Sequence, residues 1–174
     1  MTLTKSKYYF EALDNYPYRL PNCLEALNYA LSYDPEDADS LCLMGRIYSE
    51  ILYDYEKAKL YFEEAMQYNV ASLNTPQYYI KCLLDNEDLK EAETLIEYSL
   101  KIKGIDKCRI LIHKSYLFKI QLKYNKALEP LAEAKNFAYD QSMLDFLKNR
   151  EKFIKAKMPK SPKKKEGKKK KETH

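Results

Sequence analysis

The chain has 174 residues, of which 45% are hydrophobic and 32% are charged, with only three glycines and no tryptophan. This length is enough for one domain with its own core, and the composition favours helix throughout. No apolar run approaches the ~20 residues of a membrane-spanning helix, and the start does not resemble a secretory signal, so the sequence predicts a cytoplasmic protein without a membrane partner.

Residues that start or end helices divide the chain into four predicted helix pairs and one last helix. Pro21 and Pro76 suit the first turn of a helix, where a missing N–H costs nothing. Asp34-Pro35 ends a helix because the residue before proline avoids helical geometry, and Gly104 ends another. The predicted pairs span residues 4–15 with 21–33, 37–51 with 55–68, 75–85 with 88–102, and 106–121 with 124–137; the last helix spans 140–156.

The end of the chain differs in composition from the rest. The last predicted helix has one apolar and one basic face, as the cap of a repeat stack requires. Residues 158–174 are rich in Lys and Pro and cannot bury enough apolar surface to become ordered. The sequence therefore predicts a helical domain over residues 1–157 and a disordered tail. Pro130, inside the last paired helix, is expected to kink that helix.

One short pattern recurs in the second helix of every pair: a small residue, a larger apolar residue four positions on, and a small residue three beyond. It reads Cys23-Leu27-Ala30, Ala58-Phe62-Ala65, Ala92-Ile96-Ser99 and Ala127-Leu131-Ala134. The first members are 35, 34 and 35 residues apart. A period of this size is typical of stacked helical hairpins, each of which needs neighbours to bury its apolar face.

The second pair resembles the tetratricopeptide repeat (TPR) family. Its matching positions read Leu41-x2-Met44-Gly45-x2-Tyr48 followed by Ala58-x3-Phe62-x2-Ala65. Leu41 replaces the family's usual tryptophan, and Ile80 and Ser115 stand where the third and fourth copies would have glycine. The resemblance covers about residues 4–139. It implies an all-α, right-handed superhelical solenoid of about four hairpins, completed here by the C-terminal capping helix.

In TPR proteins the first helix of each hairpin lines a concave groove, so positions one repeat apart form stripes along it. One such stripe here is Ala12, Arg46, Lys81 and Tyr116. The resemblance implies a peptide-binding groove whose predicted residues are Tyr8, Arg46, Gln77, Lys81, Leu84, Ile112, Tyr116 and Lys119. Cations beside aromatic rings suit a peptide with carboxylates and one or two apolar anchors.

Two alternatives remain open for these groove residues. They can be ordinary solvated side chains, with Glu50 and Asp85 close enough to pair with the cations. Some TPR proteins also hold chaperone C-terminal tails with a clamp of Lys and Asn side chains. Only Lys81 matches that clamp here, so binding of that kind is not expected.

The charge distribution gives the tail a possible role of its own. Residues 1–151 carry 19 Lys and Arg against 24 Asp and Glu, whereas residues 152–174 carry 11 Lys against two Glu. A basic end on an acidic body favours an anionic partner or contact between tail and body. The candidate anion-binding residues are Lys163, Lys164, Lys165, Lys168, Lys169, Lys170 and Lys171. Without interleaved aromatics they predict only weak, salt-dependent nucleic-acid binding; the alternative is a solubilising tail.

The sequence gives no support for catalysis, and no enzyme, cofactor or metal site is predicted. His113 and His174 are the only histidines, and His113 is expected to be a surface or packing residue. No nucleophile elbow, phosphate loop or metal-spaced cluster is present. The four cysteines lack a CxxC pair, which favours reduced, structural thiols.

These observations predict a protein–protein interaction scaffold that binds a peptide or partner protein in its groove. Two alternatives remain: an accessory nucleic-acid- or ribosome-associated factor tethered by the lysine tail, and a dedicated chaperone for one client. Bacterial secretion chaperones resemble the chain in size and TPR content, although they typically have three repeats and no polylysine tail. No small-molecule substrate is expected.

Overall fold

A computed structural model describes residues 6–159, and within this range the protein is all-helical, as predicted, with no strand. The α-helices are α1 (Lys7–Asn15), α2 (Leu20–Tyr33), α3 (Ala38–Glu50), α4 (Tyr55–Tyr68), α5 (Thr75–Asp85), α6 (Leu89–Ser99), α7 (Lys107–Ile120), α8 (Tyr124–Ala134) and α9 (Gln141–Lys157). The lysines of the predicted tail, from Lys160 on, lie outside the described residues.

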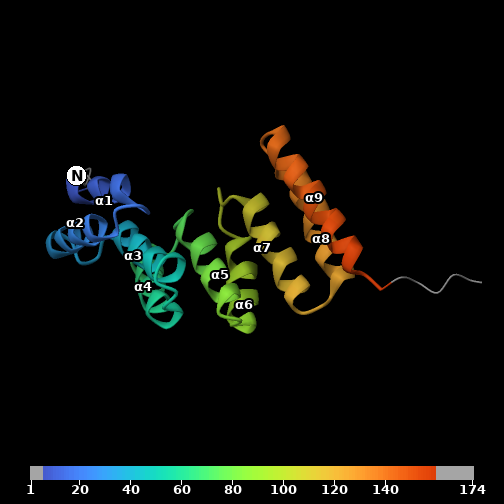
Figure 1. The fold of residues 1–174 in the computed structure, drawn as a ribbon, viewed down its shortest axis with the longest axis horizontal. Coiled ribbons are helices and arrows are strands. Elements are labelled where there is room, and N and C mark those ends of the chain that lie inside the picture. Colours follow the sequence, from blue (N-terminus) through green and yellow to red (C-terminus); the bar gives the residue numbers. More distant parts are fainter. Residues whose placement is uncertain (1–5, 160–174) are drawn as a thin grey trace, which may run out of the picture.

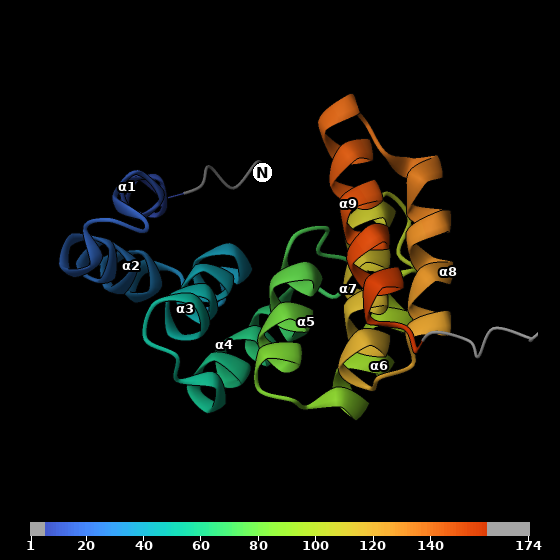
Figure 2. The same ribbon diagram turned by 45° about the vertical axis from the view of Figure 1, so that its right-hand side comes forward.

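Successive helices pair with each other and follow one another along an elongated molecule (Figure 1). The helix pairs α1–α2, α3–α4, α5–α6 and α7–α8 each pack together, and α9 packs against α8. The first helices also touch one another, α3 against α5 and α5 against α7. Figure 2 shows α8 and α9 side by side at the C-terminal end of the described chain.

Capping side chains explain why several helices begin where they do. The carboxylate of Asp37 accepts a hydrogen bond from the Ser40 N–H, and Asp54 does the same for Lys57. Each such cap contributes about 1 kcal/mol because it satisfies an N–H that has no partner within the helix. Pro21 and Pro76 lie in the first turns of α2 and α5, as predicted. Pro130 lies buried inside α8, which continues to Ala134 and then tightens into a short 3-10 turn.

The recurring pattern forms the centre of the interior. All of its residues are at most 1% exposed: Cys23, Leu27, Ala30, Ala58, Phe62, Ala65, Ala92, Ile96, Ser99, Ala127, Leu131 and Ala134. The small members let the second helix of each pair approach the first closely. The four cysteines of the chain are buried, and none forms a disulfide with another residue of the described range.

Three hairpin turns contain a residue in the left-handed region that is not glycine. Tyr53, Glu87 and Leu122 have φ angles of 54°, 61° and 59°. Each directly precedes the N-cap residue of the second helix in its pair. The left-handed conformation costs an ordinary L-residue roughly 1–2 kcal/mol. These turns therefore achieve the hairpin geometry without glycine, at some cost in stability.

Replacing Leu122 by glycine is expected to stabilise the protein by about 0.5–1 kcal/mol, because glycine adopts the left-handed region without strain. Leu122 is 71% exposed, so the replacement removes little buried apolar surface. Urea denaturation of the wild type, Leu122→Gly and Leu122→Ala measures the effect. The alanine variant is the matched control, since it removes the same side chain but keeps the strain. Equal midpoints for the two variants would contradict the expectation.

Candidate binding surface on the first helices

The helices α1, α3, α5 and α7 carry the predicted groove residues, and α9 extends the same side of the molecule. A line of charged and polar side chains crosses these helices and is called the polar row here. Its members are Arg46, Glu50, Lys81, Asp85, Arg109, His113 and Arg150. The members lie close enough to influence one another electrostatically. The charge of Glu50 affects the pKa of Lys81, and the charges of Lys81, Asp85, Arg109 and Arg150 affect the pKa of His113.

Arg46 is enclosed by aromatic rings. Its guanidinium carbon lies 4.5 Å from the ring centre of Tyr16 and 4.1 Å from that of Tyr78. Its Nε is 3.7 Å from Glu50, which also accepts a hydrogen bond from the Tyr16 hydroxyl. Burial and this hydrogen bond raise the pKa of Tyr16. Because the cluster joins α1, α3 and α5, Arg46 holds three helices together rather than standing open to a ligand.

Lys81 is the more accessible cation on the neighbouring helix. Its Nζ lies 2.8 Å from the Asp85 carboxylate one turn along α5, and 47% of its side chain is exposed. Burial acts to lower the pKa of Lys81, but the hydrogen bond to Asp85 raises it overall. Lys81 is therefore charged at neutral pH, and its ammonium group has donors beyond the one that binds Asp85.

His113 lies at the centre of the C-terminal half of the row. Burial lowers its pKa to about 4, and the nearby cations Arg109, Lys81 and Arg150 act in the same direction against Asp85. The imidazole is consequently neutral at pH 7. The sequence predicted an ordinary surface or packing residue and could not show this environment, since the cations that create it come from three helices.

The C-terminal end of the surface is closed by α9. Ile112, Tyr116 and Lys119 of α7 line a narrow crevice together with Arg150 and Phe153 of α9. The Lys119 Nζ lies 4.7 Å from the ring centre of Tyr116 and 5.7 Å from that of Phe153. Arg150 lies over the ring of Phe146, also on α9. Among the described residues, no carboxylate lies within ion-pair distance of Lys119 or Arg150, so their charges are uncompensated.

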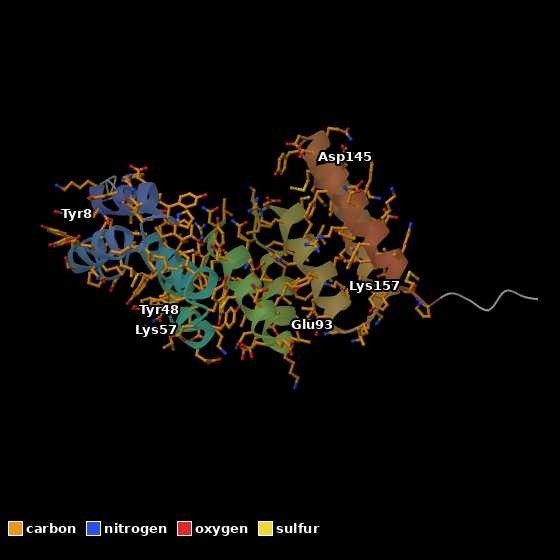
Figure 3. All side chains as sticks on the ribbon, viewed as in Figure 1. Tyr8, Tyr48, Lys57, Glu93, Asp145 and Lys157 are labelled. Carbon is orange, nitrogen blue, oxygen red and sulfur yellow. The ribbon has the colours of Figure 1, made fainter. Side chains whose placement is uncertain are left out.

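The structure places two predicted groove residues elsewhere, starting with Tyr8. Its ring stacks on Tyr29 and Tyr33 of α2, with centroids 5.3 and 5.7 Å away, near the outer end of the molecule (Figure 3). Ala12, from the neighbouring predicted stripe with Arg46 and Lys81, is fully buried. Tyr9 and Tyr16 face Arg46 instead. The alignment of α1 with the later helices is thus one residue off, because the first copy lacks the marker residues that fix the register.

Leu84 is the second correction. It is only 2% exposed and packs in the central core cluster, so it cannot contact a ligand on the surface. The repeat period identifies positions that recur, but the helices packed around α5 bury this one. Gln77 is half-buried, and its Oε1 is buried without a hydrogen-bond partner in the described structure. Tyr78, which encloses Arg46, was not among the residues predicted from sequence.

No protein-family model matches this chain, and no curated protein matches it at a significant level. Over residues 6–159, no helix is both long and apolar enough to cross a membrane. The same residues contain no group of three or more His, Cys, Asp or Glu placed to hold a metal ion.

Proposed function

We propose that the chain is a TPR-like solenoid of four hairpins capped by α9. Two observations support this architecture. The residues of the 34–35-residue pattern are buried at matching places in α2, α4, α6 and α8. The helices also pack mainly against their neighbours in chain order, which is typical of repeat proteins.

We further propose that the protein is an interaction scaffold whose polar row, together with Lys119 beside Arg150 at its C-terminal end, binds an acidic segment of a partner protein. The observation that carries this proposal is the pair Lys119 and Arg150, which have no carboxylate within ion-pair distance in the described chain. Burial is the main cause of the lowered pKa of His113, and cations from α5, α7 and α9 lower it further, in keeping with a positive surface here. A positive surface on a body of net negative charge attracts anionic groups.

The neighbouring side chains favour a peptide over an isolated anion. Tyr116 and Phe153 lie beside Lys119, and the Phe153 side chain is 47% exposed. A peptide can place a carboxylate on the cations and an apolar side chain on these rings at the same time. The four buried thiols, none in a disulfide, support a reducing, cytoplasmic location for such a scaffold.

Replacing both Lys119 and Arg150 by glutamine is expected to weaken partner binding at least about tenfold, because each charge-assisted hydrogen bond contributes roughly 1.5–3 kcal/mol. The measurement is quantitative mass spectrometry of proteins that co-purify with the tagged full-length chain. Lys148→Gln with Lys152→Gln is the matched control, since these α9 residues line a different depression, away from α7.

Partner recovery that is equal for the two double variants would contradict the proposal. The same measurement on a chain ending at Met158 tests the tail-based alternative. If removal of the tail lysines, rather than replacement of Lys119 and Arg150, abolishes co-purification of proteins or nucleic acid, the tail is the binding element. A single client recovered in fixed ratio would instead favour the dedicated chaperone.

A further inference from the structure

A second candidate surface lies between α4 and α6, away from the polar row. Its floor is formed by Tyr79 and Leu83 of α5, the helix that lies between the other two in both ribbon views (Figures 1 and 2). Leu95 and Tyr98 of α6 add apolar side chains to one wall. The depression is shallow and widely open to solvent, with a volume of about 650 Å³. This feature is called the α4–α6 slot.

Side-chain contacts link the two sides of the slot near both ends of the helices. At the N-terminal ends of the two helices, Lys59 of α4 lies 2.9 Å from the carboxylate of Asp88, the N-cap of α6. At the C-terminal ends, the Tyr98 hydroxyl donates a hydrogen bond of 2.9 Å to the carbonyl of Val70. These two contacts tie α4 and the residues that follow it to α6, and so fix the two sides of the slot relative to each other.

The charges around the slot are predominantly negative. Glu63 on α4 and Glu91 on α6 stand on its two sides, with Lys90 beside Glu91 as the one basic residue of the lining. Within the described chain, no cation lies within ion-pair distance of either glutamate. Glu63 accepts a 3.0 Å hydrogen bond from the Tyr79 hydroxyl, which leaves its second oxygen available to another donor.

We propose that the α4–α6 slot binds an apolar side chain of leucine or phenylalanine size, carried by a lysine- or arginine-flanked helical segment of a partner protein. The apolar floor takes the anchor, and Glu63 and Glu91 take the flanking cations. This surface prefers the opposite charge to the polar row, so the scaffold has two sites with different partners. The protein's own tail does not fit, because residues 163–171 contain only Lys, Glu and Gly and supply no anchor.

The probes that test this proposal are three synthetic helix-forming peptides of equal length. The first carries leucines on one face and lysines on the other, the second replaces every lysine by glutamate, and the third replaces every leucine by serine. Titration calorimetry with the full chain is expected to detect binding of the first peptide only. Amide NMR shifts are expected at Thr94 and Leu95 and not at His113.

Matched variants then locate the site. Glu63→Gln with Glu91→Gln is expected to weaken binding of the leucine–lysine peptide about fivefold, the effect of losing two exposed ion pairs. Glu64→Gln with Glu93→Gln removes the same charge from the same helices outside the slot, and should change affinity less than twofold; Figure 3 labels Glu93 on α6. Thr94→Trp, on an exposed position, should fill the slot and abolish binding.

The proposal is overturned by any of three results: no binding of the leucine–lysine peptide, equal binding of all three peptides, or equal loss in the two glutamate variants. Because the probe is cationic, these results do not depend on the acidic partner proposed for the polar row. Failure of one site therefore leaves the other standing.

Discussion

Replacing Gly45 by alanine is expected to lower the free energy of unfolding by about 2–3 kcal/mol, the upper part of the range for an overpacked core. A Cβ atom at this position would lie 2.8 Å from Cδ1 of Phe62, well inside van der Waals contact. Phe62 is fully buried, and its ring stacks on Tyr79 with centroids 5.4 Å apart. The ring has no free space to move into, so the helices must separate.

Urea denaturation of a double-mutant cycle measures this contact directly. Phe62→Leu alone should destabilise the protein because it leaves a cavity. The double variant Gly45→Ala with Phe62→Leu should lose less free energy of unfolding than the sum of the two single losses, because leucine leaves room for the new methyl group. The fourth helix pair already has this combination: Ser115 stands at the position of Gly45, and Leu131 on the facing helix stands at the position of Phe62. Additive effects would show that the clash with Phe62 is not the cause of the destabilisation.

The second large effect is a loss of stability in mild acid caused by His113. Its pKa in the folded protein is about 4, against an ordinary value of 6.5. As the pH falls below about 6.5, the unfolded chain takes up this proton while the folded protein does not. Stability therefore falls between about pH 6.5 and pH 4, by at most about 3 kcal/mol, because each unit of pKa shift corresponds to about 1.4 kcal/mol.

Urea midpoints of the wild type and His113→Gln at pH 7.5, 6.5, 5.5 and 4.5 test this expectation. The variant should lose much less stability over this interval. Carboxylates with lowered pKa values, such as Glu151 at about 2, weaken the protein only at more acidic pH and do so in both proteins. Identical pH profiles for the two proteins would contradict the assignment to His113.

The helices could be predicted closely from the sequence because their boundaries depend on local chemistry. Pro76 and the capping carboxylate of Asp54 act within one turn, so their effects can be recognised without knowing the fold. The repeat pattern likewise identified the buried centre of α2, α4, α6 and α8. In a helical chain, small residues at a fixed period are typical of places where helices pack closely.

The binding surface could be predicted only in part, because it depends on contacts between helices. The prediction placed Arg46 on the surface but could not show Tyr16 and Tyr78 on either side of it, since those residues come from α1 and α5. The burial of Leu84 depends on how several helices pack around α5. The α4–α6 slot had no signal in the sequence, because its walls lie about thirty residues apart and share no motif.

The way in which the core is divided has a consequence for how cooperatively the protein unfolds. The buried residues fall into an N-terminal, a central and a C-terminal cluster. Among the partly buried side chains of the described residues, Leu31, Tyr48 and Tyr61 pack against both the N-terminal and the central cluster, and Leu100 packs against both the central and the C-terminal cluster. In a repeat protein, the unfolding of one unit affects the stability of the next through the contacts that the two units share. Helix α7 contributes Ile110 and Leu117 to the central cluster and Cys108 and Leu111 to the C-terminal one. Helices α8 and α9 can therefore open without breaking the central cluster only while α7 stays in place.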